Sequence, residues 1–294
     1  MFKQIVKTAK AFNSGRNVEN EGLSKTEDNV ILKDLIESNK EQMIGKRDSM
    51  SILFKLLDAS ERLVIQVHPT VEFAKKHFNS PCGKTECWYI LNEGGYVYLG
   101  FKEGITKEHM KELFLEQDIE GMLSSMHRFD VKKGDFIFVN GGVPHAIGKG
   151  CFLAELQEPT DLMVIPEKVT PSGVELAEEK LHCGLGFDKM FECLSYEGID
   201  REETKKKYFL EPKKIDENIK SIADERVTDK FKLFEIQVDG EYIYKMMSYG
   251  IVLVIEGSGK INGIQVKIGD RLFIPESEKE IIIDGKIKVL VCRP

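Results

Sequence analysis

The stretch "KKGDFIFVNGGVPH" at residues 132–145 bears most directly on the fold of this chain. Its order of a basic residue, any residue, Gly-Asp, any residue and three apolar residues recurs in "KIGDRLFIPESEKE" at residues 267–280. Gly-Asp before an apolar run is also a common turn signal, so the pattern alone leaves a chance repeat open. However, strand–turn–strand segments, "YILNEGGYVYLG" and "LVIEGSGKINGI", precede both copies. We therefore interpret the chain as containing two related β-barrel units.

The two copies differ in the polar residues that they carry. When Gly134 is aligned with Gly269, His145 falls opposite Glu280, and the second copy contains no His. We therefore expect that only the first unit holds a polar site and that the second barrel lacks metal ligands.

Composition and charge narrow the class of protein. The chain has 294 residues, enough for one large domain or two of ordinary size. Its 42 basic and 49 acidic residues sum to −7, which argues against a general nucleic-acid surface and against anionic membranes. The six cysteines are few and scattered, no run of 18 apolar residues occurs, and the N-terminus has no signal-peptide core. We expect a cytoplasmic protein that binds neither nucleic acid nor membranes.

The pattern along the chain predicts four parts. An N-terminal extension with one amphipathic helix near 30–43 is expected over 1–48, and a metal-binding β domain over 49–170, with a helical insertion near 105–126. A helical segment and charged linker are expected over 171–228, and a degenerate second β domain over 229–294.

Two polar residues interrupt the apolar run of "ERLVIQVHPT" at residues 61–70. On an extended strand Gln66 and His68 share one face, and packing alone gives no reason for that. A single His beside a Pro is usually a structural residue, so the pair needs partners elsewhere in the chain before it indicates a site.

Such partners occur in two further segments. "GKTECWYIL" offers Glu86 at the start of a strand, with Lys84 before it, and "GGVPHAIG" offers His145. Two imidazoles, a carboxylate and an amide oxygen are a suitable ligand set for a divalent first-row metal, zinc above all. The combination therefore predicts one Zn²⁺ per chain, bound by Gln66, His68, Glu86 and His145.

Four segments together resemble a known family. "IQVHP", "GKTECWYIL", "KKGDFIFVNGGVPHAIGKG" and "ELQEPTD" are similar, in order and spacing, to the type I mannose-6-phosphate isomerases in their short bacterial form. The resemblance is good over about 50–170, and the repeat at 229–294 agrees in outline. It implies a mainly β fold of two cupin (jelly-roll) barrels with helical insertions. It also implies that zinc is held by the four residues already named.

The resemblance implies a reaction and roles for further residues. The reaction is the interconversion of mannose 6-phosphate and fructose 6-phosphate through a cis-enediol, in a monomer or homodimer. Lys84 would supply a cation near the developing oxyanion. Glu155 matches an acid of the family that points into the same pocket, and Asp161 matches the Asp that follows that acid.

Three departures from the family pattern concern catalysis. Val64 stands where the family has a Ser that contacts the substrate phosphate, and Ile165 stands where it has a catalytic Arg. The Trp-Gly-Gly segment expected near the N-terminus is absent. Lys149 or Lys168 could partly replace the Arg in binding substrate, although Lys cannot reproduce a bidentate contact. Two alternatives therefore stay open: a metal-binding cupin that binds or senses a sugar phosphate without turning it over, and a cupin enzyme for a different small molecule.

Overall fold

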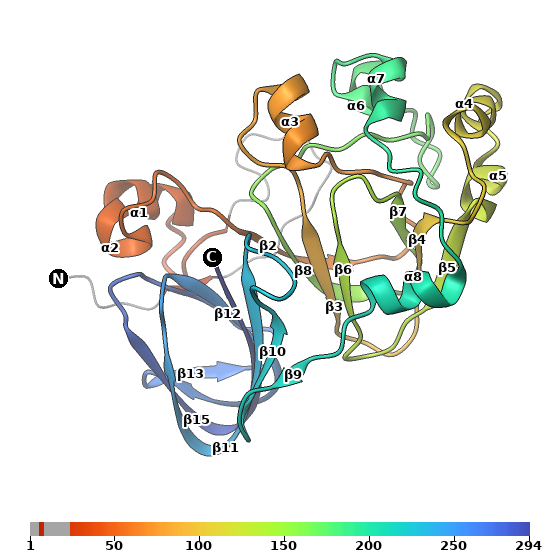
Figure 1. Cartoon of the computed structure of the whole chain (residues 1–294). Coiled ribbons are helices and arrows are strands. Elements are labelled where there is room, and N and C mark those ends of the chain that lie inside the picture. The colour runs from red at the N-terminus through yellow and green to blue at the C-terminus, as the bar shows by residue number, and fades with distance from the viewer. Residues whose placement is uncertain (1–5, 9–23) are drawn as a thin grey trace. The chain divides into compact units, whose positions relative to one another are not determined.

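The computed structural model describes residues 6–8 and 24–294, and in these ranges the chain is mainly β (Figure 1). It divides into two compact units, one of residues 57–210 and one that combines 1–56 with 211–294. The predicted limits of four parts stay a prediction, and residues 1–5 and 9–23 of the expected N-terminal extension lie outside the described residues.

The unit of residues 57–210 contains two antiparallel sheets. The order of the first is β2-β8-β3-β6, and β2 carries the chain across the boundary between the units. Its strands are β2 (Leu53–Asp58), β8 (Phe152–Gln157), β3 (Glu86–Ile90) and β6 (Phe136–Val139). The order of the second is β5-β4-β7, with β5 (Met126–Asp130), β4 (Tyr96–Phe101) and β7 (His145–Ile147). Every residue of β3, β6 and β7 is buried, so both faces of these short strands are covered.

This unit also contains six helices. They are α3 (Val71–Phe78), α4 (Lys107–Glu116), α5 (Ile119–Ser124), α6 (Glu178–His182), α7 (Phe187–Glu192) and α8 (Arg201–Tyr208). Side chains cap the N-termini of four of them, α3, α4, α5 and α8. Thr106 accepts a hydrogen bond from the His109 amide and Asp118 one from the Gly121 amide, which fixes the starts of α4 and α5. These two helices confirm the helical insertion expected near 105–126. No helix of the described ranges is long and apolar enough to cross a membrane.

The second unit is built on an eight-stranded sheet of order β1-β14-β12-β15-β11-β10-β9, with β13 paired to β12. Its strands are β1 (Val6–Thr8), β9 (Lys213–Lys214), β10 (Ile219–Ala223), β11 (Lys232–Lys245), β12 (Gly250–Ile261), β13 (Ile264–Lys267), β14 (Arg271–Ile274) and β15 (Glu280–Arg293). Two short helices, α1 (Leu32–Ser38) and α2 (Lys40–Ile44), lie where one amphipathic helix was expected.

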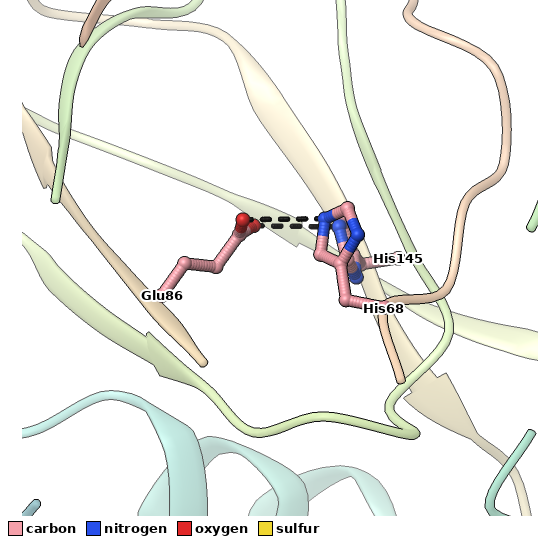
Figure 2. Close-up of side chains that lie close together, drawn as sticks. All are labelled: His68, Glu86 and His145. Carbon is pink, nitrogen blue, oxygen red and sulfur yellow. Dashed lines mark ion pairs between the residues drawn. The ribbon is translucent and has the colours of Figure 1, made fainter. Parts of the chain in front are cut away.

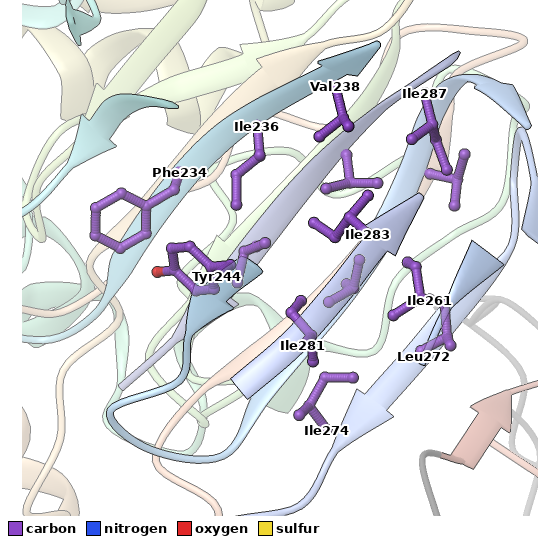
Figure 3. Packing of buried hydrophobic residues seen from close by; sticks show 14 of the residues in the cluster. Phe234, Ile236, Val238, Tyr244, Ile261, Leu272, Ile274, Ile281, Ile283 and Ile287 are labelled. Carbon is purple, nitrogen blue, oxygen red and sulfur yellow. The ribbon is translucent and has the colours of Figure 1, made fainter. Parts of the chain in front are cut away.

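The long strands of this sheet fold over at glycines. Gly240 on β11 pairs with Gly285 on β15, and both have positive φ, 112° and 121°. A side chain on Gly285 would meet the Gly259 backbone at 2.8 Å, so the close approach of the strands requires glycine there. As a result the rings of Phe234 and Tyr244, ten positions apart on β11, lie 6.1 Å apart and close over one aliphatic interior (Figure 3).

The repeat found in the sequence is also a repeat of local structure. The Asp135 carboxylate accepts a hydrogen bond from the Lys132 amide at 3.0 Å, and Asp270 accepts one from Lys267 at 2.9 Å. The glycine before each Asp has nearly the same φ, 88° in the first copy and 87° in the second. The two turns lead into β6 and β14, which confirms that the two segments are equivalent in backbone conformation.

Candidate metal centre and active site

Three buried side chains from distant parts of the chain converge in the unit of residues 57–210 (Figure 2). His68 Nε2 lies 3.2 Å from Glu86 Oε2, and His145 Nε2 lies 3.4 Å from Glu86 Oε1. The exposed fraction of each side chain is 1 % or less. Their potential ligand atoms all lie within 4.8 Å of one another, so His68, Glu86 and His145 could hold one metal ion.

The two sheets of this unit place these side chains. Glu86 is the first residue of β3 in one sheet, and His145 is the first residue of β7 in the other. His68 is two residues after Gln66. The backbone of Gln66 exchanges two hydrogen bonds with that of His145, at 2.9 and 3.0 Å, and so holds this segment beside β7. The expected strand around Gln66 is therefore reduced to isolated bridges, with β7 and with Val164. Gln66 is partly buried beside the cluster, and its role as a ligand stays a prediction.

Both imidazoles are oriented for a metal. His68 Nδ1 lies 3.0 Å from the Leu162 carbonyl and His145 Nδ1 lies 2.9 Å from the Val143 carbonyl, so each Nδ1–H donates and each Nε2 presents a lone pair to Glu86. Histidines that bind metals are usually held in this way through their other ring nitrogen. Within the described ranges the buried Nε2 of His145 has no hydrogen-bond partner, which fits a position left for a metal ion.

The electrostatics of the cluster favour the protonation states that a metal requires. Burial lowers the pKa of His145 to about 3, and burial together with the Lys84 charge lowers the pKa of His68. Burial opposes ionisation of Glu86, but the Lys84 ammonium and the His68 ring outweigh it and hold the pKa of this carboxyl well below its usual range. Neutral imidazoles and a charged carboxylate are the forms that bind divalent metals.

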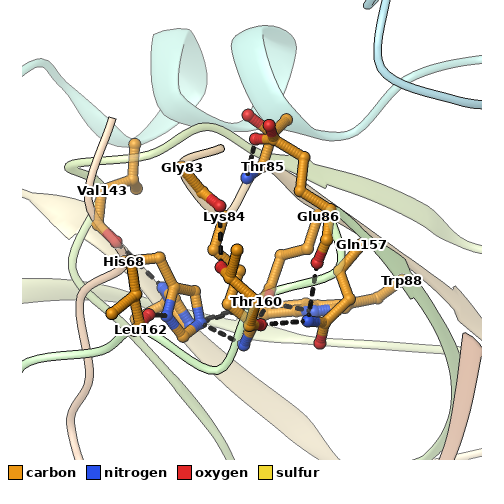
Figure 4. A network of polar contacts seen from close by, with 12 residues as sticks. His68, Gly83, Lys84, Thr85, Glu86, Trp88, Val143, Gln157, Thr160 and Leu162 are labelled. Carbon is orange, nitrogen blue, oxygen red and sulfur yellow. Dashed lines mark hydrogen bonds and ion pairs between the residues drawn. The ribbon is translucent and has the colours of Figure 1, made fainter. Parts of the chain in front are cut away.

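Lys84 is the cation closest to the cluster among the described contacts (Figure 4). Its Nζ lies 2.9 Å from His68 Nε2 and 3.1 Å from Glu86 Oε2, and the residue is only 6 % exposed. Burial would lower the pKa of Lys84, but the charges of Glu86 and Glu155 outweigh burial and raise it. Trp88 Nε1 donates to Glu86 Oε1 at 2.9 Å and so fixes the carboxylate from the other side.

Strand β8 adds two polar side chains to the same face. Glu155 pairs with Trp88 and Gln157 pairs with Glu86 across the β3–β8 ladder, and both are buried. Sequence reasoning found Glu155 but missed Gln157, which donates to the carbonyls of Glu158 and Thr160 at 3.0 and 2.7 Å. The sequence did indicate Gln157, because it is two residues after Glu155 and residues two apart on a strand share a face.

Asp161 and Lys149, two of the predicted substrate-binding residues, lie in different places relative to the cluster. Asp161 is exposed and acts electrostatically on Lys84, which places it on the same side of the site. Lys149 lies in the turn after β7. The carbonyl of the next residue, Gly150, accepts a hydrogen bond from Asn92, which follows the end of β3 opposite to Glu86. The structure therefore does not bring Lys149 to the cluster.

The position where the family has an Arg is apolar in this protein. Ile165 is 6 % exposed and belongs to a buried hydrophobic cluster, against which Val64 also packs. Lys168 is exposed, and its Nζ lies over the Phe114 ring of α4, 5.1 Å from the ring centre, so its role in binding substrate stays a prediction. Neither Ile165 nor Val64 can form the charged or hydroxyl contact that the family pattern predicts.

Comparison with known proteins agrees with this geometry. Residues 10–88 match the family described as phosphomannose isomerase type I, catalytic domain. A probable mannose-6-phosphate isomerase, GmuF of Bacillus subtilis, is 30 % identical over 255 residues, which are 83 % of this chain and 75 % of that protein. The mannose-6-phosphate isomerase of Streptococcus mutans is 26 % identical over 89 % of this chain and 80 % of its own.

Solved structures confirm the fold. The mannose 6-phosphate isomerase of Bacillus subtilis aligns with a TM-score of 0.75 at 23 % identity, over 95 % of this chain and 88 % of its own. A mannose 6-phosphate isomerase described as holo and zinc-bound aligns with a TM-score of 0.74 at 17 % identity, over 92 % and 87 % of the two chains. The mainly β, cupin-type fold expected from the sequence is thereby confirmed.

Proposed function

Because this chain belongs to the mannose-6-phosphate isomerase family, we propose that it interconverts mannose 6-phosphate and fructose 6-phosphate. The observation that carries the proposal is the buried His68–Glu86–His145 cluster with the Lys84 ammonium beside it. A purely structural core has little use for so many ionisable groups, since burying a charge is costly unless it is paired.

The metal in this proposal is one Zn²⁺ per chain. His68, Glu86 and His145 would hold it, and Gln66 would supply a fourth ligand from the residue that pairs with His145. When bound, zinc would act as a Lewis acid and stabilise negative charge that develops on the sugar. The carbonyls of Leu162 and Val143 would keep the two rings oriented toward it.

The reaction moves a proton between C1 and C2 of the sugar through a cis-enediol. We assign the proton transfer to Glu155, a buried carboxylate on β8 whose charge acts on Lys84. The base removes the proton from C2 of the aldose and returns it to C1, while a proton passes from O2 to O1. The ammonium of Lys84 stabilises the negative charge that develops on the oxygens.

We assign substrate positioning to Asp161, an exposed residue near the site. The charge of Asp161 acts on Lys84, which supports a role for Asp161 in contacting a sugar hydroxyl. Val64 and Ile165 leave two family contacts unmade, and this observation favours a second candidate, a protein that binds a sugar phosphate without turnover.

One experiment separates the two candidates. Zinc-loaded protein is incubated with mannose 6-phosphate, and fructose 6-phosphate is followed by a coupled assay, with binding measured in parallel by calorimetry. The first candidate predicts turnover that Glu155→Gln and His145→Ala abolish. Binding without turnover would support the second candidate, and neither binding nor turnover would exclude both for this substrate.

A further inference from the structure

The unit that contains residues 211–294 has a pocket of its own, with a volume of about 450 Å³. Its walls come from β10, β11 and the last residues of β15, and include Phe234, Tyr244 and Arg293. Pockets for small molecules usually have volumes in the range of about 300–1,000 Å³ and are mainly apolar, with a few polar groups.

The fold-over of β11 creates this pocket. Because the strand bends, the ring of Tyr244 returns to within 6.1 Å of the Phe234 ring. The Arg293 guanidinium lies over the Phe234 ring, 5.0 Å from its centre. In Figure 3 the Tyr244 hydroxyl points away from the aliphatic interior, toward the side on which Phe234 lies.

Two buried donors in this pocket have no acceptor within the described part of the chain. They are Tyr244 Oη and Arg293 Nε. Burial raises the pKa of Tyr244 while the nearby Arg293 charge acts against burial, so the hydroxyl and the guanidinium are close neighbours. Tyr242, another residue of the pocket wall, differs, because its hydroxyl donates to Asp216 at 3.0 Å.

Buried donors without acceptors destabilise a folded protein, so they are rare unless a ligand satisfies them. The pocket is also unusually apolar at its rim. Ile215, Ile243 and Met247 have exposed fractions of 54, 51 and 73 %, and Lys245 adds a second positive charge. An apolar wall with two donors, one of them cationic, matches a ligand that has an apolar body and an anionic acceptor group.

We propose that the pocket around Phe234, Tyr244 and Arg293 binds a small apolar carboxylate, whose oxygens accept hydrogen bonds from Tyr244 Oη and Arg293 Nε. The apolar body of the ligand would lie against Phe234 and extend to the rim at Ile243 and Met247. This site is separate from the residues of the isomerase site and does not depend on the proposed reaction.

Octanoate is a suitable probe, and 1-octanol is its uncharged counterpart. Binding to the full chain is measured by calorimetry and by saturation-transfer NMR. We expect octanoate to bind and 1-octanol to bind at least about 10-fold more weakly, because a hydrogen bond to a charged group contributes more than a neutral one.

Two tyrosine variants form a matched pair. Tyr244→Phe should weaken octanoate binding about 10-fold or more, while Tyr242→Phe should change it less than about 2-fold, since the Tyr242 hydroxyl already has an acceptor. Without octanoate, Tyr244→Phe should unfold at the same temperature as the wild type or higher, because it removes an unsatisfied group. Arg293→Gln should weaken binding of octanoate but not of 1-octanol.

Several outcomes would overturn the proposal. These are no octanoate binding at millimolar concentration, equal weakening by both tyrosine variants, or a lower melting temperature of Tyr244→Phe without octanoate. A dimer in analytical ultracentrifugation that Met247→Lys dissociates would show instead that the apolar rim binds a second copy of the chain. Circular dichroism of each variant verifies that it is folded.

Discussion

The segments at 132–145 and 267–280 begin with the same turn and end in different environments. In both, an Asp accepts a hydrogen bond from the amide three residues earlier, and a four-residue strand follows. His145 then opens β7 and is fully buried, whereas the aligned Glu280 opens β15 and is exposed. The two turns therefore have the same backbone conformation, while the residues that follow them lie in different environments.

The interiors of the two units show the consequence. Residues 57–210 bury His68, Lys84, Glu86, His145 and Glu155 in one network. The interior of the sheet formed by β10–β15 is a continuous aliphatic cluster instead, including Ile281 and Ile283. The interior of a β domain can be aliphatic or polar, but a polar interior is stable only when each charge has a partner or a metal.

The largest effect is expected for Glu86→Gln, which removes the carboxylate that both imidazoles face. Mutation of a residue that only supports a metal ligand typically lowers metal affinity about 10–100-fold. Loss of the ligand itself should lower it further, so that bound zinc per chain approaches zero. Elemental analysis after dialysis measures this. Glu93→Gln, at an exposed turn, serves as the control and should keep its zinc. Full zinc content in Glu86→Gln would show that the cluster is not the metal site.

The polar interior should also make the metal-free protein sensitive to acid. His145 has a pKa near 6.5 when unfolded and about 3 when folded, so below pH 6.5 the unfolded chain gains a proton that the folded chain does not. Stability is therefore complete above pH 6.5 and falls as the pH decreases toward 3, by up to roughly 4–5 kcal/mol. Urea unfolding at pH 7 and pH 4 measures the difference.

Substitution of the His145 side chain tests whether it causes the loss of stability in acid. His145→Gln should lose much less stability between pH 7 and pH 4, while His109→Gln, at an exposed helix position, should behave as the wild type does. Equal losses in all three proteins would mean that the cluster does not cause the acid sensitivity.

The apolar interior should respond to loss of volume instead of loss of charge. Ile283→Ala should lower the free energy of unfolding by about 2–5 kcal/mol, because Ile283 is fully buried in the aliphatic cluster. Ile282→Ala, on the neighbouring position with 39 % exposure, should cost clearly less. Both variants should keep one zinc per chain, and loss of zinc from Ile283→Ala alone would contradict the separation of the two interiors.

The smallest effects concern the shared turn. Asp135→Ala and Asp270→Ala each remove one side-chain hydrogen bond to a backbone amide, which typically contributes about 1 kcal/mol. The two losses in chemical unfolding should agree within about 0.5 kcal/mol if the turns are equivalent. A loss confined to one of the variants would show that the repeat is only a resemblance in sequence.

Much of the site could be predicted because its residues lie in short motifs with regular spacing. His68, Glu86 and His145 were found from "QVH", "KTE" and "VPHA", and the structure brings the three together. Glu155 was predicted from the resemblance and its catalytic role stays a prediction. The neighbouring Gln157 was not predicted, because its position beside Glu86 depends on cross-strand pairing. Lys149 was predicted as a partial substitute for the missing Arg, and the strand direction places it at the other end of β3 from Glu86.

The sequence by itself determined the local structure and the donor chemistry of this protein. Gly-Asp turns, helix caps and alternation along strands depend on neighbours in the chain, so they can be predicted from the sequence without knowledge of the tertiary structure. Tertiary structure alone decided which donors meet. It joined Glu86 and His145 from two sheets, and it folded β11 so that Tyr244 and Arg293 line one pocket. Such contacts depend on strand pairing between residues far apart in the chain, which local spacing does not specify.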